Sequence, residues 1–149
     1  MTTDTKTSGP DPREAAERIF RAHAGEKAWL DTFAEHFDRQ RSGQSLARTL
    51  SVWGLSQSEA SRLLGISRQA IAKWLDRGAP ADRQEMLGDL AAATDILVHY
   101  VKRDRIPAVV RRPIAARGGV SLLDFVASGD SRELLATVRA MFDFAAIPA

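Results

Sequence analysis

The residues whose side chains could bind a ligand are concentrated directly after Gly65, near the middle of the sequence. Four of them occupy the outward face of the helix predicted after Gly65, namely Arg68, Gln69, Ala72 and Lys73. An arginine there can donate two hydrogen bonds to the edge of a guanine, and a glutamine can form two hydrogen bonds with an adenine. A lysine can pair with a phosphate. A small alanine lets the helix sit deep in a groove. These positions therefore predict contacts to DNA bases and phosphates.

Two further polar residues, Gln57 and Ser67, lie at the predicted N-termini of helices. Side-chain and backbone donors at a helix N-terminus can hold phosphate oxygens, which fixes a protein on the duplex without reading its sequence. We therefore expect both residues to contribute to DNA binding.

The surrounding segment reads as two helices joined by a tight turn. Ser56 and Glu59 form a capping box that opens the first helix. Gly65 permits the left-handed backbone conformation that ends it. Ser67 then caps the second helix, and Ile71 points inward and wedges that helix across the first. This pattern predicts a helix-turn-helix, and the alternative is a plain helical hairpin with a solvated polar face.

Three helices are predicted before this motif. The first begins at Pro12 and breaks at Gly25, and the second is expected to end near Ser42-Gly43. The third runs from Ser45 to Gly54. The second helix carries aromatic residues at helical spacing, which we interpret as core or packing residues: Trp29, Phe33 and Phe37.

After the motif, a long helix is predicted from Pro80, with an apolar seam formed by Leu87, Leu90, Thr94, Leu97 and Val101. The seam is either domain core or a dimer contact, and we favour core. Pro107 and Pro113 break the next stretch. A short helix over Leu122–Val126 follows, and Asp130 opens the last helix.

The predicted fold class is all-α, because no alternating strand pattern extends beyond a few residues. It comprises a helix-turn-helix DNA-binding bundle, a small C-terminal helical domain and extra N-terminal helices. We expect a disordered tail over 1–10, an N-terminal helical extension over 11–42, a helix-turn-helix domain over 43–78 and a C-terminal domain over 79–149.

The composition is that of a globular chain, with 149 residues of which 44% are hydrophobic and 27% charged. There is no cysteine, which excludes disulfides and thiolate metal sites and fits a reducing compartment. The polar N-terminus does not read as a signal peptide, and no stretch approaches the roughly 18 apolar residues of a membrane span. We expect a cytoplasmic protein without membrane association.

The net charge is only +2, but the basic residues are clustered. Residues 41–77 contain six basic residues against two acidic ones, and residues 102–117 contain six against one. Such clustering is typical of a phosphate-facing surface, although a single run of this kind is more often ordinary solvated charge.

Catalysis is the least favoured class of function. The three histidines, His23, His36 and His99, are far apart, and none belongs to a motif. The sequence contains no phosphate-cradling glycine loop and no metal-ligand spacing. We therefore expect neither an enzyme nor a metal or cofactor.

From about Leu46 onward, the order of parts resembles the Xre/MbcA/ParS antitoxins. The matching segments are Lys73-Trp74-Leu75, the helix Leu87–Tyr100, Arg112-Pro113, the stretch 119–126 and Gly129-Asp130. In that family the C-terminal domain binds and blocks a RES-type toxin that consumes NAD, and the antitoxin, usually dimeric, represses its own operon. The resemblance implies DNA, a cognate protein toxin and a second copy of the chain as partners.

If the resemblance holds, the toxin contact would lie on the last helix and the tail, at Phe142, Phe144 and Ile147. The alternative is that these apolar residues fold back onto the core. Two other functions stay open: a stand-alone Xre-like repressor whose C-terminal domain only dimerises, and a protein-interaction module that does not bind DNA. A dimer is expected because one helix-turn-helix reads only a few base pairs. Its interface is either the apolar seam or the N-terminal helices.

Overall fold

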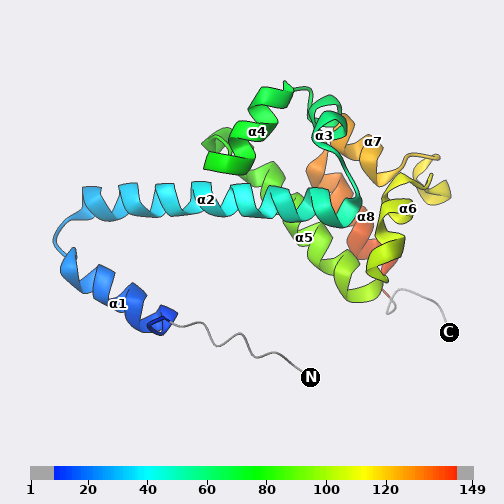
Figure 1. Cartoon of the computed structure of the whole chain (residues 1–149). Helices are drawn as coiled ribbons and strands as arrows, with labels where there is room; N and C mark the ends of the chain where they lie inside the picture. Colours follow the sequence, from blue (N-terminus) through cyan, green and yellow to red (C-terminus); the bar gives the residue numbers. More distant parts are fainter. Residues whose placement is uncertain (1–8, 144–149) are drawn as a thin grey trace. The chain divides into compact units, whose positions relative to one another are not determined.

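The computed structural model describes residues 9–143, and this part of the chain is helical apart from one isolated β-bridge between Ile114 and Val120 (Figure 1). The all-α prediction is confirmed. The helices are α1 (Pro12–Ala22), α2 (Lys27–Trp53), α3 (Gln57–Leu64), α4 (Arg68–Arg77), α5 (Gln84–Tyr100), α6 (Ile106–Arg111), α7 (Leu122–Ala127) and α8 (Ser131–Met141). Short 3-10 turns cover Ala81–Arg83, Arg103–Arg105 and Ala115–Arg117.

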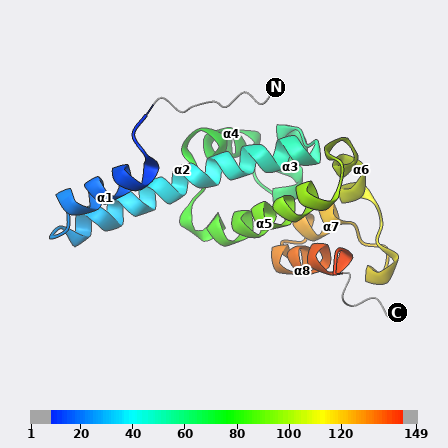
Figure 2. The same ribbon diagram turned by 90° about the horizontal axis from the view of Figure 1, so that it is seen from below.

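The chain divides into two compact units, Met1–Phe37 and Asp38–Ala149, and α2 runs through the division. The second unit contains the core. Within it α8 packs along α5, and α3 contacts both α4 and α7 (Figure 2). The expected seam of α5 lies inside this core, because Leu87, Leu90, Thr94 and Leu97 are all buried. The core interpretation of the seam is therefore confirmed, and those four residues are not available to a second chain.

Thr94 is the one polar residue of the seam, and its hydroxyl both accepts and donates a hydrogen bond. The Trp53 indole donates from Nε1 to the Thr94 hydroxyl at 3.0 Å, and that hydroxyl donates to the Leu90 carbonyl at 2.7 Å. Both side chains are buried, so leaving either polar group without a hydrogen-bond partner would lower the free energy of unfolding. The threonine thus fixes the end of α2 against the middle of α5.

The break expected at Ser42-Gly43 is wrong, because α2 is continuous through it. Ser42 is buried, and its hydroxyl donates to the Arg39 carbonyl and accepts from the Ala79 N–H at 2.9 Å. A Cβ at Gly43 would lie 2.7 Å from the Trp74 carbonyl oxygen. These two residues therefore serve close packing inside a helix, where the sequence suggested a helix end.

The C-terminal part contains one helix that the sequence did not predict. Pro107 was expected to break the chain, but it lies in the first turn of α6, where a proline loses no helical hydrogen bond. The predicted helices at 122 and 130 are present. Ser121 forms a capping box with Asp124 at the start of α7, and Asp130 accepts from the Glu133 N–H at the start of α8.

The first unit is a helical hairpin made by α1 and the beginning of α2. Asp11 caps α1 through the Arg13 N–H at 2.9 Å, as the sequence suggested. None of the residues of α1 is buried. No helix within residues 9–143 has the length and apolar character that a membrane crossing requires.

Candidate nucleic-acid interface

The two helices α3 and α4 are held by local hydrogen bonds at both sides of their turn. The Ser56 hydroxyl accepts from the Glu59 N–H at 3.1 Å, and the Ser67 hydroxyl accepts from the Ala70 N–H at 3.0 Å. Gly65 has φ 66° and ψ 32°, the left-handed conformation that glycine adopts without steric cost. The Ser56 and Ser67 caps and the Gly65 turn are confirmed. The capping box predicted for Ser56 and Glu59 is only half formed, because the Glu59 carboxylate pairs with Arg111.

The α4 helix has two clearly different faces. Ile71 and Trp74 are buried against the rest of the unit. Arg68, Gln69 and Lys73 are exposed, and none of their side chains forms a hydrogen bond or ion pair within residues 9–143. The apolar face therefore anchors the helix, and the polar face presents unpaired donors to solvent.

The other residues expected to touch DNA are also on the surface. Ala72 is exposed beside Lys73, and Gln57 is exposed in the first turn of α3. Ser67 is exposed as well, and its hydroxyl oxygen is engaged by the Ala70 N–H. That hydroxyl keeps its own proton to donate, so capping α4 and contacting a phosphate are compatible. The structure thus brings all six predicted residues to the α3–α4 pair.

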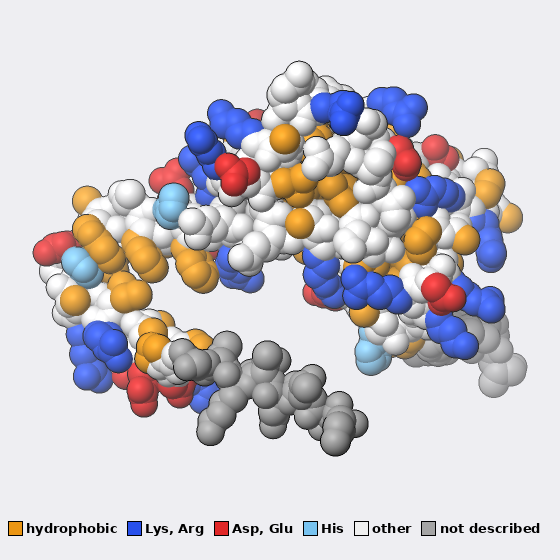
Figure 3. Space-filling model, in the orientation of Figure 1, with side chains coloured by type: hydrophobic (Ala, Val, Ile, Leu, Met, Phe, Trp, Pro, Cys, Tyr) orange, Lys and Arg blue, Asp and Glu red, His pale blue; other side chains and the backbone are white. Residues whose placement is uncertain are grey.

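The basic residues around α4 form part of an exposed surface. In Figure 3, Lys and Arg side chains gather over α3 and α4 along the upper edge of the view. Two of the basic residues in 41–77 have acidic partners: Arg48 pairs with Asp95 at 2.5 Å, and Arg77 pairs with its neighbour Asp76 at 3.5 Å. The other four are exposed and have no acidic partner within residues 9–143, and all but Arg41 lie on α3 or α4: Arg41, Arg62, Arg68 and Lys73. The basic character thus concentrates on the α3–α4 surface itself.

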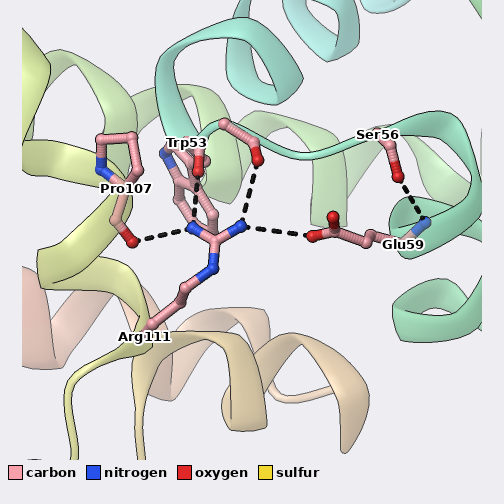
Figure 4. Close-up of polar contacts among 6 residues, drawn as sticks. Trp53, Ser56, Glu59, Pro107 and Arg111 are labelled. Carbon is pink, nitrogen blue, oxygen red and sulfur yellow. Dashed lines mark hydrogen bonds and ion pairs between the residues drawn. The ribbon is translucent and has the colours of Figure 1, made fainter.

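The second basic cluster, over 102–117, serves partly as internal structure. Arg111 extends from α6 to the end of α2, where it donates to the carbonyls of Trp53 and Gly54 at 3.0 Å each (Figure 4). It also donates to the Pro107 carbonyl at 2.7 Å and pairs with Glu59 at 3.2 Å. The single guanidinium therefore ties α6, the end of α2 and the first turn of α3 together.

This role of Arg111 was missed from the sequence, where it counted only as one basic residue among six. Arg117 is similarly engaged, since its guanidinium pairs with Glu133 of α8. No local sequence pattern predicts the Arg111–Glu59 or the Arg117–Glu133 pair, because the acidic partners are distant in the sequence. The members of this cluster that have no acidic partner within residues 9–143 are the exposed residues Lys102, Arg103, Arg105 and Arg112.

Of the predicted partner-binding residues, Phe142 lies in the described part of the chain, directly after α8. Phe142 is half-buried and stacks on Tyr100, with ring centroids 4.8 Å apart and nearly parallel. It therefore folds back onto the C-terminus of α5. Phe144 and Ile147 lie outside the described residues. Tyr100 itself is 50% exposed, so the stacked pair remains accessible from solvent.

Charged contacts on the remaining surface of the second unit are of the ordinary stabilising kind. Arg132 of α8 donates to Glu85 of α5 at 3.0 Å from Nε, and this hydrogen bond, with the charge of the carboxylate, raises the pKa of Arg132. Among residues 9–143, no group of three or more histidine or acidic side chains is arranged to hold a metal ion.

Comparisons with known proteins give a likeness in fold. No family model matches the chain, and no curated protein sequence matches it. Among solved structures, a chain from the crystal structure of the M. tuberculosis MbcT–MbcA toxin–antitoxin complex matches with a TM-score of 0.57 and 20% identity. The match covers 70% of this chain and 96% of that chain. This protein therefore has the all-helical fold of a component of a toxin–antitoxin complex.

Proposed function

We propose that this chain is a sequence-specific DNA-binding antitoxin. In this proposal α4 reads bases in the major groove, and the C-terminal half neutralises a RES-type toxin. The protein would also repress its own operon. The fold likeness to a toxin–antitoxin component supports the antitoxin role, and the resemblance of the sequence to the Xre/MbcA/ParS antitoxins implies the RES class of toxin.

The observation that carries the DNA-binding proposal is the division of α4 into two faces. Ile71 and Trp74 are buried, so the helix cannot rotate to hide its polar side. Arg68 and Gln69 lie in the first turn of α4, next to the capped N-terminus. In helix-turn-helix proteins the N-terminal residues of the second helix contact base edges. The first turn of α4 therefore carries the two residue types that best distinguish guanine and adenine.

The test is binding of the purified protein to a labelled fragment of its own upstream region, compared with a scrambled fragment over a salt series. We expect Arg68→Ala to weaken binding to the specific fragment by ~1–3 kcal/mol and to relax base preference. Lys73→Ala should weaken binding to both fragments and reduce the salt slope by about one. Equal behaviour of the two variants would contradict this assignment of roles.

Two further variants separate base readout from simple charge. Arg68→Lys keeps the positive charge but loses the planar fork, so it should lose specificity and keep the salt slope. Arg139→Ala removes the same charge from an exposed position on α8. It should leave the preference for the specific fragment unchanged. Loss of preference with Arg139→Ala as well would indicate a general electrostatic effect.

The partner proposal concerns the surface around Tyr100 and Phe142. Their stacked rings, with Tyr100 50% exposed, form a candidate anchor, because aromatic residues dominate the energetics of many interfaces. The test uses a RES-fold toxin encoded beside this gene and measures its NAD consumption with and without the chain. We expect inhibition by the wild type and weaker inhibition by Tyr100→Ala.

The same experiment decides between the two regulatory functions. A neighbouring reading frame without the RES fold, or a toxin that stays active in the presence of the chain, favours a stand-alone repressor. The salt-series experiment is independent of that outcome, because it contains no toxin. Failure of Arg68→Ala and Lys73→Ala to affect DNA binding would instead favour a protein-interaction module.

A further inference from the structure

Four of the five N–H donors of the Arg111 guanidinium are engaged within the protein. Nη1 donates to the Trp53 carbonyl at 3.0 Å and to the Pro107 carbonyl at 2.7 Å (Figure 4). Nη2 donates to the Gly54 carbonyl at 3.0 Å and to the Glu59 carboxylate at 3.2 Å. This guanidinium is therefore part of the fold and does not offer a forked pair of donors to a DNA phosphate.

The turn that receives Arg111 is also in close contact with the start of α6. Gly54 has φ 67°, and a Cβ at this position would lie 3.1 Å from Cγ of Pro107. The side-chain hydrogen bonds and this close approach together hold α6 against the end of α2, immediately before α3 begins. The charge environment of α3 thus depends on a residue of the C-terminal half of the chain.

Glu59 is the acidic residue of α3, and its position makes its charge important. It lies in the first turn of α3 with Gln57, which is one of the residues expected to contact DNA. An unpaired carboxylate here would repel an approaching phosphate. It could also pair with Arg62, the basic residue of α3, because side chains three residues apart are neighbours on a helix. Such a pair would remove one positive charge from the α3–α4 surface.

The structure shows Glu59 paired with Arg111 instead. The two side chains are each 39% exposed, and Arg62 is exposed without an acidic partner within residues 9–143. A partly exposed ion pair contributes little to stability by itself. Its effect on charge is larger, because the carboxylate is neutralised from the side of α6 while Arg62 stays unpaired on the surface.

From these contacts we propose that Arg111 is a positioning residue for DNA binding. It neutralises Glu59 and keeps Arg62 unpaired, so that the first turn of α3 can approach a phosphate. The inference rests on the proposed DNA-binding function and adds regulation to it, because DNA affinity then depends on the docking of α6. Arg111 acts through Glu59 and does not itself contact the DNA.

The test is a double-mutant cycle in the full chain, with the affinity for the upstream and the scrambled fragments measured at low and high salt. Arg111→Ala should weaken binding to both fragments by about threefold or more at low salt, because it leaves a bare carboxylate in the first turn of α3. Glu59→Gln should strengthen binding to both by a similar factor, because the charge of Arg111 is then uncompensated. The double variant should bind within about twofold of the wild type, since the charge of the pair is again zero.

A purely structural role of Arg111 predicts a different result. If Arg111 acted only by tying α6 to α2, Glu59→Gln would weaken DNA binding or leave it unchanged. The double variant would then bind no better than Arg111→Ala. Glu59→Gln keeps a side-chain carbonyl that can accept from Nη2 of Arg111, so this variant tests the proposal even if Arg111→Ala does not fold.

Arg117 and Glu133 form the matched control, because they are also an ion pair of the second unit and neither lies on α3 or α4. Arg117→Ala and Glu133→Gln change the net charge by the same amounts as the two test variants. Each should change the DNA affinity less than its counterpart does, because salt screens charges that lie away from the contact. Equal changes in the control pair would reduce the effect to net charge and overturn the proposal.

Weaker DNA binding by Glu59→Gln, or a double variant that binds as poorly as Arg111→Ala, would also overturn the proposal. Those results leave the proposed function intact when the wild type prefers its own upstream fragment. A wild type without that preference would refute sequence-specific binding alone, because the cycle on the scrambled fragment still tests the effect of charge. A wild type that binds neither fragment would refute both.

Discussion

The two halves of α2 have similar sequence patterns and opposite environments. The first half places Trp29, Phe33 and Phe37 at helical spacing, and all three are exposed. The second half places Leu46, Leu50 and Trp53 at similar spacing, and all three are buried. Both halves belong to one uninterrupted helix. An apolar stripe therefore shows that a helix needs a neighbour, but not whether the same chain supplies it.

The second half of α2 has its neighbours in the same unit, and they satisfy its polar groups as well. Ser42, Thr49 and Trp53 are buried, and each forms a hydrogen bond to a side chain or backbone group. The first half has polar contacts only at the surface, such as the Lys27–Asp31 pair at 2.6 Å. Substitutions in the two halves and in their surroundings should thus differ in the size of their effect on the free energy of unfolding.

The largest difference is expected between Leu97→Ala and Phe33→Ala. Leu97 is fully buried, so its truncation should lower the free energy of unfolding by ~2–5 kcal/mol at every protein concentration. Phe33→Ala should change it by less than about 0.5 kcal/mol, because the Phe33 side chain is 41% exposed. Urea unfolding followed by tryptophan fluorescence measures both. Equal effects of the two variants would show that the hairpin has a core of its own.

Two helical glycines should respond to alanine with opposite sign. A Cβ at Gly43 would lie 2.7 Å from the Trp74 carbonyl oxygen, so Gly43→Ala should destabilise the second unit by ~1–3 kcal/mol. A Cβ at Gly88 would meet nothing within 4 Å, so Gly88→Ala in α5 should stabilise it by ~0.5–1 kcal/mol. Thermal unfolding compares the two variants. Stabilisation by Gly43→Ala would mean that α2 and the end of α4 are not in close contact.

Thr94 and Thr32 each donate a hydrogen bond to the carbonyl four residues earlier in their own helix, one in a buried and one in an exposed position. Replacing each with valine compares the energetic cost of losing a buried and an exposed polar contact. Thr94→Val removes the acceptor of the Trp53 indole and should cost ~1–3 kcal/mol in the free energy of unfolding. Thr32 donates to the Ala28 carbonyl at 2.9 Å on an exposed face, so Thr32→Val should change it by less than about 0.5 kcal/mol. Chemical denaturation is the measurement, and a near-neutral Thr94→Val would argue against the buried indole contact.

The smallest loss of stability is expected when an exposed ion pair is removed. This loss should be about equal in the hairpin and in the second unit. Lys27→Ala removes an i,i+4 pair from the hairpin and should reduce helix stability by ~0.3–0.5 kcal/mol at low salt. Arg48→Ala removes the Arg48–Asp95 pair of the second unit and should have a similarly small effect. Circular dichroism at low and high salt measures the change. A large, salt-independent effect of Lys27→Ala would point to a structural role beyond the pair.

The sequence by itself determined the elements whose signals are local. Ser56, Gly65 and Ser67 define the turn between α3 and α4, because each acts through backbone groups within a few residues. The same holds for Asp130 at the start of α8. The exposed face of α4 also followed from spacing, since a helix with Ile71 turned inward must turn Gln69 and Lys73, two residues before and after it, outward.

The tertiary structure decided everything that depends on distant neighbours. Ser42-Gly43 continues a helix because Ala79 and Trp74 lie against it, and Arg111 joins three segments through carbonyls far from it in the chain. Phe142 folds back because Tyr100 offers a ring to stack on. The partners of a side chain depend on which segments the fold brings together, so the local spacing of residues cannot predict them.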